Sequence, residues 1–233
     1  MALETSDVIS LVRGELSDPL VGGSDAASLW SEEELYHYLD EAQREFARET
    51  LCLSDATTYT DLPATADSPW VDFDDLIVEV RQAYYGANKR NLSVKTLADM
   101  ERGVGRDDYG SGSIGSNWQQ ATGVPTTIIT DMEYGRARLY PIPTEDDTVD
   151  LMVYREPLEE VEDSGVDLEI PPRFRRALIH SVVSAATGKD DADTHDKELS
   201  NVRGILWRNS MAEAKSFFNK KQRRAPTTRY GGI

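Results

Sequence analysis

Residues 110–115, GSGSIG, match the G-x-G-x-x-G pattern with which dinucleotide-binding proteins surround a pyrophosphate. That pattern requires a strand before it and a helix after it, so that the phosphates meet the N-terminus of the helix. Here the polar stretch RDDY precedes the glycines and SNWQQATGVP follows them. Because neither flank supplies the required element, the sequence favours a mobile glycine-rich loop over residues 103–115 and predicts no cofactor.

The acidic stretch DDADTHD, residues 190–196, resembles a calcium-binding loop. If Asp191 were the first position of an EF-hand, the sixth would be Asp196 in place of glycine and the twelfth would be Val202 in place of glutamate. Such a loop would lack its turn residue and its bidentate ligand. The stretch is therefore predicted to be a turn between helices, with acids near the positive end of the next helix, and no metal site is expected.

Three histidines, His37, His180 and His195, and the single cysteine, Cys52, are the other residues that could act as bases or nucleophiles. None lies in an H-x-x-x-H pattern or beside G-x-S-x-G, and Cys52 has no protease-type signature around it. Paired acids carry little information in a chain with 42 Asp and Glu. We expect a protein that is not an enzyme. An enzyme with an unrecognised site stays open, and a pocket with converging titratable groups would be its mark.

The composition is that of a globular protein, with 233 residues of which 39% are hydrophobic and 29% charged. One cysteine excludes an intramolecular disulfide framework. The first residues, MALETSDVIS, lack the basic region of a signal peptide, and no run approaches ~18 apolar residues, so we expect a soluble, intracellular protein without a membrane span. The net charge of −17 argues against wrapping nucleic acid with the main body.

Residues 1–54 predict two helices. The first begins at Ser6 and ends before Asp18–Pro19, and the second begins with Ser31 and Glu34 at capping-box spacing. Each helix has one apolar stripe, formed by Val8, Ile9, Val12 and Leu16 in the first and by Leu35, Leu39, Ala42 and Phe46 in the second. Two such helices need further helices to bury these stripes.

Residues 55–168 predict an antiparallel, β-rich insertion. Short runs rich in Val, Ile, Thr and Tyr recur between turn residues, at 57–63, 76–85, 91–97, 126–131, 137–141 and 148–157. Within RLYPIPTEDDTVDLMVY, residues 138–154, two strands flank an acidic turn, and Pro141 and Pro143 suit a hairpin at a sheet edge because proline cannot donate a ladder hydrogen bond.

Residues 169–218 predict two more helices. The first starts near Pro172 and carries the stripe Phe174, Ala177, Leu178, Val182 and Ala185; the second runs from about Thr194 to Phe218 with Leu199, Val202, Leu206, Ala214 and Phe217 on one face. The predicted fold is α+β: a four-helix bundle with an inserted antiparallel β-rich subdomain and an extended C-terminal arm. That arm, residues 219–233, is the fourth predicted segment.

The C-terminal segment is basic in an acidic chain. Residues 211–233 contain six Lys or Arg but only one acid, Glu213, so the rest of the chain is more acidic still. Pro226 and two terminal glycines discourage helix. A docking arm and a solvated terminus are both compatible with this composition. A third alternative is a nucleic-acid-associated protein anchored by its basic tail, which a salt-dependent affinity for DNA would favour.

The order of these features resembles bacteriophage head-to-tail connector proteins, the adaptors below the portal ring that include the tail tubular A proteins of short-tailed phages. The resemblance rests on pieces spread over nearly the whole chain: WSEEELYHYLDEAQREFARET, Trp118, TGVPTTIITD, RLYPIPTEDDTVDLMVYREP, and IPPRFRRALIHSVVSAA before a long helix and a basic tail. The glycine-rich segment 103–115 departs from the family pattern because it is longer than the pattern needs.

The resemblance implies a structural protein of the virion, made in the host cytoplasm and placed at the head–tail junction. It implies a ring, expected to have twelve copies, that joins the portal protein to tail or nozzle proteins and lets DNA pass through without specific binding. It implies no cofactor, no catalysis and no membrane contact. The portal-binding residues would lie in the basic tail: Lys220, Lys221, Arg223, Arg224, Arg229 and Tyr230.

Overall fold

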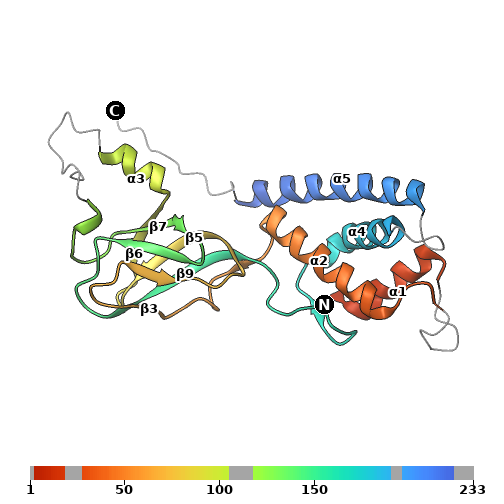
Figure 1. Cartoon of the computed structure of the whole chain (residues 1–233), viewed down its shortest axis with the longest axis horizontal. Coiled ribbons are helices and arrows are strands. Elements are labelled where there is room, and N and C mark those ends of the chain that lie inside the picture. Colours follow the sequence, from red (N-terminus) through yellow and green to blue (C-terminus); the bar gives the residue numbers. More distant parts are fainter. Residues whose placement is uncertain (1–2, 19–27, 105–117, 190–195, 223–233) are drawn as a thin grey trace. The chain divides into compact units, whose positions relative to one another are not determined.

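The computed structural model describes residues 3–18, 28–104, 118–189 and 196–222. The chain forms two compact units (Figure 1). The helical unit combines Met1–Leu53 with Glu156–Ile233, and the β unit is Ser54–Arg155. The glycine pattern at 110–115, the acidic stretch up to His195 and the C-terminal residues from 223 onward lie outside the described residues.

Helix α4, Arg175–Gly188, forms the centre of the helical unit. It contacts the other three long helices of this unit: α1 (Thr5–Leu16), α2 (Glu32–Thr50) and α5 (Lys197–Gln222). Its buried residues cover more than half of the helix circumference, well beyond one stripe: Ala177, Leu178, Ile179, His180, Val182, Val183, Ala186 and Thr187. A helix that is buried over most of its circumference is a core element, not one amphipathic wall of a bundle.

The predicted four-helix bundle is therefore wrong. The structure is a mixed α+β fold in which α4 is enclosed by its neighbours, whereas a four-helix bundle places four amphipathic helices around a shared seam. Segments outside the helices also contribute side chains to this core. Val161, Leu168 and Ile170 are buried in it, and Leu3–Glu4 (β1) pairs antiparallel with Asp167–Leu168 (β10). Among the stripe residues predicted for α4, Ala185 is exposed.

The first two helices follow their sequence signals closely. Val8, Ile9, Val12 and Leu16 are all buried, although the residue before α1 is Glu4 and Ser6 lies inside the helix. Ser31 caps α2 as predicted, because its Oγ accepts a hydrogen bond of 3.2 Å from the backbone N–H of Glu34. The Glu34 carboxylate instead pairs with Lys189, just after α4, at 2.5 Å.

The buried face of α5 differs from the predicted one. Of the predicted face, Ala214 is buried, but Val202, Leu206 and Phe217 are 49%, 38% and 36% exposed. The large core-facing side chains lie on another stripe of the helix: Trp207, Met211 and Phe218. Both stripes have helical spacing, so periodicity alone could not select between them. The tryptophan stripe is buried because it offers the larger apolar area to α2 and to the segment that precedes α4.

The β unit contains one eight-stranded sheet among its described residues, in the order β2-β9-β5-β6-β7-β8-β4, with β3 also paired to β9. The strands are β2 (Ser54–Asp55), β3 (Leu62–Ala64), β4 (Trp70–Asp72), β5 (Ile77–Tyr85), β6 (Arg90–Lys95), β7 (Thr127–Glu133), β8 (Arg136–Tyr140) and β9 (Asp147–Arg155). Because β3 and β4 contact each other, the sheet curls back on itself and encloses its own apolar core.

Two details of the predicted insertion are wrong. The sheet is not wholly antiparallel, since β6 and β7 pair in parallel through Ser93–Thr127, Val94–Ile128 and Lys95–Ile129. The predicted hairpin over residues 138–154 also does not form: β8 pairs with β7 and β4, whereas β9 pairs with β5, β2 and β3. The strand β9 is buried on both faces, which suits an interior strand rather than an edge.

Helix α3, Leu97–Val104, supplies the crossover that a parallel pair requires. It begins with a reciprocal cap: the Asp99 N–H donates to Thr96 Oγ1 at 3.2 Å, and the Thr96 hydroxyl donates to the Asp99 carboxylate at 2.9 Å. Met100 and Ile129 meet beneath it, with Trp118 of the short 3-10 helix Trp118–Gln120. Residues 103 and 104, where the predicted glycine-rich loop was to begin, therefore belong to α3.

The two chain ends of the β unit are tied by a buried ion pair. Asp55 in β2 accepts hydrogen bonds from the backbone N–H groups of Thr57 and Thr58 at 2.8 and 3.0 Å, and from Arg155 Nε at 2.7 Å. Burial alone would raise the pKa of the Asp55 carboxyl, but these donors outweigh it and hold the pKa well below its usual range. The first and last strands of the unit are thereby held side by side.

Replacement of Phe46 by alanine tests the core of the helical unit. Phe46 is fully buried, and its ring centroid lies 5.3 Å from that of Phe174 and 5.9 Å from that of Trp207. Phe46→Ala should lower the free energy of unfolding by ~3–5 kcal/mol, the usual cost of emptying a buried aromatic site. Leu206→Ala, on the half-exposed face of α5, is the control and should cost less than ~1 kcal/mol.

Urea unfolding followed through the helical circular dichroism signal measures both changes. Equal losses for the two variants would contradict this assignment of core and surface.

Candidate interaction surfaces

The described part of the predicted portal-binding set lies on the last turn of α5. The helix α5 continues to Gln222, past the end predicted at Phe218, and therefore includes Lys220 and Lys221. Both lysine side chains are exposed. Cations at this position complement the negative end of the helix dipole. Arg223, Arg224, Arg229 and Tyr230 lie outside the described residues, so their contact with a portal protein stays a prediction.

An aromatic cluster fixes the end of α5. Phe218 is buried with its ring centroid 5.5 Å from that of Phe174, and Phe217 lies 6.0 Å from the same ring. The guanidinium of Arg173 covers the Phe217 ring at 4.0 Å from its centroid, and Lys215 forms an ion pair with Glu49 of α2. The helix end that carries Lys220 and Lys221 is therefore a rigid starting point for the residues that follow.

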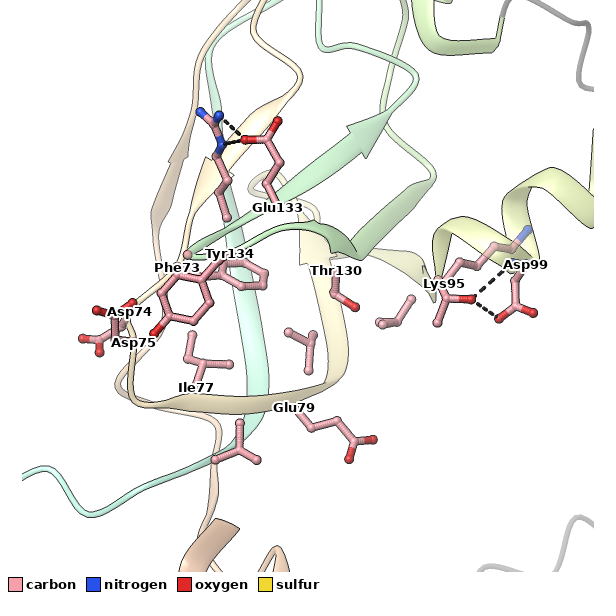
Figure 2. Close-up of a pocket in the computed structure, with 16 residues that line it drawn as sticks. Phe73, Asp74, Asp75, Ile77, Glu79, Lys95, Asp99, Thr130, Glu133 and Tyr134 are labelled. Atoms are coloured by element: carbon pink, nitrogen blue, oxygen red, sulfur yellow. Dashed lines mark hydrogen bonds and ion pairs between the residues drawn. The ribbon is translucent and has the colours of Figure 1, made fainter. Parts of the chain in front are cut away.

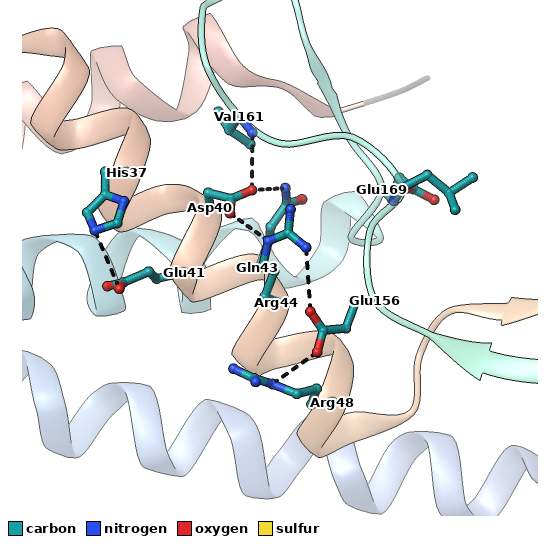
Figure 3. Close-up of polar contacts among 10 residues, drawn as sticks. His37, Asp40, Glu41, Gln43, Arg44, Arg48, Glu156, Val161 and Glu169 are labelled. Atoms are coloured by element: carbon teal, nitrogen blue, oxygen red, sulfur yellow. Dashed lines mark hydrogen bonds and ion pairs between the residues drawn. The ribbon is translucent and has the colours of Figure 1, made fainter. Parts of the chain in front are cut away.

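A polar network holds the chain where it re-enters the helical unit (Figure 3). Asp40 of α2 accepts hydrogen bonds from the Val161 N–H at 3.1 Å and from Arg44 Nε at 2.6 Å. Arg44 and Arg48 reach the two carboxylate oxygens of Glu156 at 3.5 and 3.4 Å. Burial alone would lower the pKa of the Arg44 guanidinium, but Asp40 and Glu156 outweigh it and raise the pKa. Every charge in this network is paired, which is typical of structural support.

The two histidines within the described ranges, His37 and His180, have separate partners. His37 is on the exposed face of α2, 3.5 Å from Glu41 (Figure 3). His180 is buried in α4, and its Nδ1 lies 3.1 Å from Arg203, which in turn pairs with Glu15 at 3.0 Å. Burial and the neighbouring Arg203 cation lower the pKa of the His180 imidazole. An uncharged imidazole beside a paired arginine has a packing role in this core.

The single cysteine, Cys52, is half-buried just past the end of α2. Burial raises the pKa of the Cys52 thiol to about 11, so the nucleophilic thiolate is scarce at neutral pH. Within the ranges that the structure describes, no group of three or more His, Cys, Asp or Glu side chains is placed to hold a metal ion. None of the described helices is long and apolar enough to cross a bilayer.

The β unit has an open groove of about 570 Å³ where its sheet divides (Figure 2). The strand β6 pairs with β5 only through Arg90–Leu92 and then pairs with β7 from Ser93 onward. The first half of β5 and the second half of β7 therefore diverge. The groove between them is closed at its ends by the first turn of α3 and by the turn between β7 and β8.

The lining of this groove is acidic and partly apolar. It contains five carboxylates and two cations: Asp74, Asp75, Glu79, Asp99 and Glu133, with Lys95 and Arg136. Its apolar residues are Phe73, Ile77, Val78, Val80 and Val94, beside Tyr134, which is 88% exposed. Sequence patterns do not point to this surface, because paired acids such as Asp74–Asp75 are common in so acidic a chain. Only the fold brings these residues beside those of α3 and the β7–β8 turn.

A model of the SU10 adaptor protein family matches residues 4–230, which include both units. The chain belongs to the SU10 adaptor protein family. Its role is thus that of a bacteriophage adaptor, a structural protein that interacts with other phage head or tail proteins. No curated protein sequence matches the chain. The functional sites of such an adaptor are the surfaces that bind other proteins.

The pH dependence of stability tests the environment of His180. Because the folded-state pKa is lowered, the unfolded chain binds a proton more readily than the folded adaptor as pH falls through the ordinary histidine value near 6.5. Stability should therefore fall between pH 7 and pH 5, and His180→Gln should reduce this loss. Urea unfolding at several pH values measures it, and His37→Gln, at an exposed histidine, is the matched control. A slope that His180→Gln leaves unchanged would refute the assignment.

Proposed function

We propose that this adaptor joins the head of a tailed bacteriophage to its tail, as a ring between the portal and the tail through which DNA passes. The observation that carries the proposal is the family match over residues 4–230, which takes in the helical unit, the β unit and the basic C-terminal segment together. Within the adaptors, the chain is proposed to act like the tail tubular A proteins of short-tailed phages. Its role is structural and not catalytic.

The proposed ring contains twelve copies, with the portal protein on one side and tail or nozzle proteins on the other. The net charge of −17 per chain supports passage of DNA without specific binding, because an acidic lumen repels phosphate. The protein would assemble in the host cytoplasm and remain in the virion at the head–tail junction.

The portal contact is assigned to Lys220, Lys221, Arg223, Arg224, Arg229 and Tyr230. Lys220 and Lys221 support it by their exposure at the end of a helix whose last turns are held by Phe174. Arginine offers planar pairs of donors to carboxylates, and tyrosine can bury its ring at an interface while its hydroxyl keeps a partner. The expected portal surface is acidic and contains an apolar notch.

Deletion of residues 222–233 tests the portal contact. The shortened chain should keep its circular dichroism spectrum, because both cores lie in the retained residues, but should no longer sediment with portal-bearing heads. Particles assembled with it should leak DNA or lack tails. Arg223, Arg224 and Arg229 replaced together by Glu should reproduce the loss, whereas replacement by Lys keeps the charge and should restore part of the binding.

Normal yields of infectious particles from the deletion would show that the segment is a solvated terminus. Tight, salt-dependent binding of DNA by the purified full chain would instead favour the nucleic-acid-associated alternative.

A further inference from the structure

The groove of the β unit exposes a strand edge that has no neighbour among the described residues. The strand β5 pairs with β9 from Ile77 to Tyr85, but its other edge meets β6 only at Ala83, Tyr84 and Tyr85. Residues 77–80 on that edge form one wall of the groove, opposite Thr130 and Glu133 of β7 (Figure 2). An open strand edge carries unpaired N–H and C=O groups that can pair with an added strand.

The charges of the groove favour a positively charged strand as its partner. Glu133 pairs with Arg136 and Asp99 with Arg102 at 3.2 Å, but within the described chain no Lys or Arg pairs with Asp75 or Glu79. These two exposed carboxylates lie along the open edge of β5, beside the half-buried Ile77. Main-chain hydrogen bonds would supply affinity here, and the carboxylates would determine the sign of the partner's charge.

We propose that this groove binds residues 223–233 of a second copy of the chain as a strand added to the open edge of β5. The segment reads RRAPTTRYGGI, with three arginines and no acid, in a chain that has 42 acidic residues against 25 basic ones. Its positive charge is therefore complementary to the acidic groove. Most other surfaces of a second copy are acidic, and the groove would repel them.

The length and residue types of the segment also fit. Its eleven residues, when extended, span at most roughly 40 Å, which exceeds the length of the open edge at residues 77–80. Thr227, Thr228 and Tyr230 are residues that favour strands. Pro226 cannot donate a hydrogen bond to a ladder, but this is tolerated in an edge strand, which the added strand would be.

This contact rests on the proposed function, since it adds a second acceptor for the segment that is assigned to the portal. In adaptor not yet joined to a head, the groove of a neighbouring copy holds the segment. The portal then competes for it. The two contacts remain separable because changes in the groove leave residues 219–233 intact.

The test uses the full-length chain and a fluorescent peptide with the sequence of residues 222–233, QRRAPTTRYGGI. Fluorescence anisotropy should show binding that weakens as salt is added. The double variant Asp75→Lys/Glu79→Lys should weaken it at least about tenfold, which corresponds to ~1.4 kcal/mol. The matched control Glu145→Lys reverses an exposed acid of the same unit outside this groove and should change binding less than about twofold.

Hydrogen exchange locates the contact. In the full chain, added peptide should slow exchange at residues 77–80 relative to the same chain with a peptide whose arginines are replaced by glutamate. Asp74 is left unchanged in the variants because its Oδ1 accepts from the Leu76 N–H at 2.9 Å and shapes the turn before β5. Glu79→Gln alone, a milder change, should weaken binding in the same direction.

Three outcomes would overturn the proposal: no peptide binding, equal binding by the double variant, or equal binding of a scrambled peptide of the same composition. Protection of residues 77–80 in a full chain that stays monomeric at every concentration would assign the groove to the segment of the same chain, which also overturns it. If groove variants lose peptide binding but still join portal-bearing heads, the portal contact stands independently. Failure of the peptide alone likewise leaves that contact untouched.

Discussion

The helical unit is built from two stretches of chain separated by the whole β unit, and its core depends on bringing them together. Helix α4 follows the return of the chain, yet α1 and α2, which precede the departure, cover much of its surface. Arg44 and Arg48 of α2 pair with Glu156 at the first residue after the β unit, and Asp40 holds Val161. The Asp40 and Glu156 carboxylates are largely buried and are stable there because they are paired, so the network favours this path for the returning chain.

The β unit meets the same constraint at its own chain ends. Asp55 and Arg155 lie on its first and last strands and are joined at 2.7 Å in a nearly buried pair. An insertion whose ends are held together adds little entropy cost to the unit that receives it, because the loop is already closed by its own fold. Each unit can therefore have a separate core, as the distinct apolar clusters show.

The sequence predicted individual helices and strands better than it predicted which of them pack or pair with one another. Stripes such as Leu35, Leu39 and Phe46 identify helices because spacing and capping act within a few residues. The predicted four-helix bundle is wrong because α4 is buried over most of its circumference and α5 has apolar residues on two faces, and only tertiary contact decides which face is buried. Likewise, five of the six predicted strand runs form and the run at 57–63 is a strand only from Leu62, but the pairing of β9 with β5 rather than β8 depends on residues about seventy positions apart.

The groove shows why the candidate site was harder to predict than the elements around it. Glu79, Asp99 and Thr130 come from three places in the sequence, and each alone is an ordinary surface residue. They form a site because β6 changes partners after Leu92, which leaves one edge of β5 uncovered. A fully closed barrel would have no such edge. A sheet that is curled but incompletely paired suits an assembly protein, since one edge stays available to another chain while the apolar core remains buried.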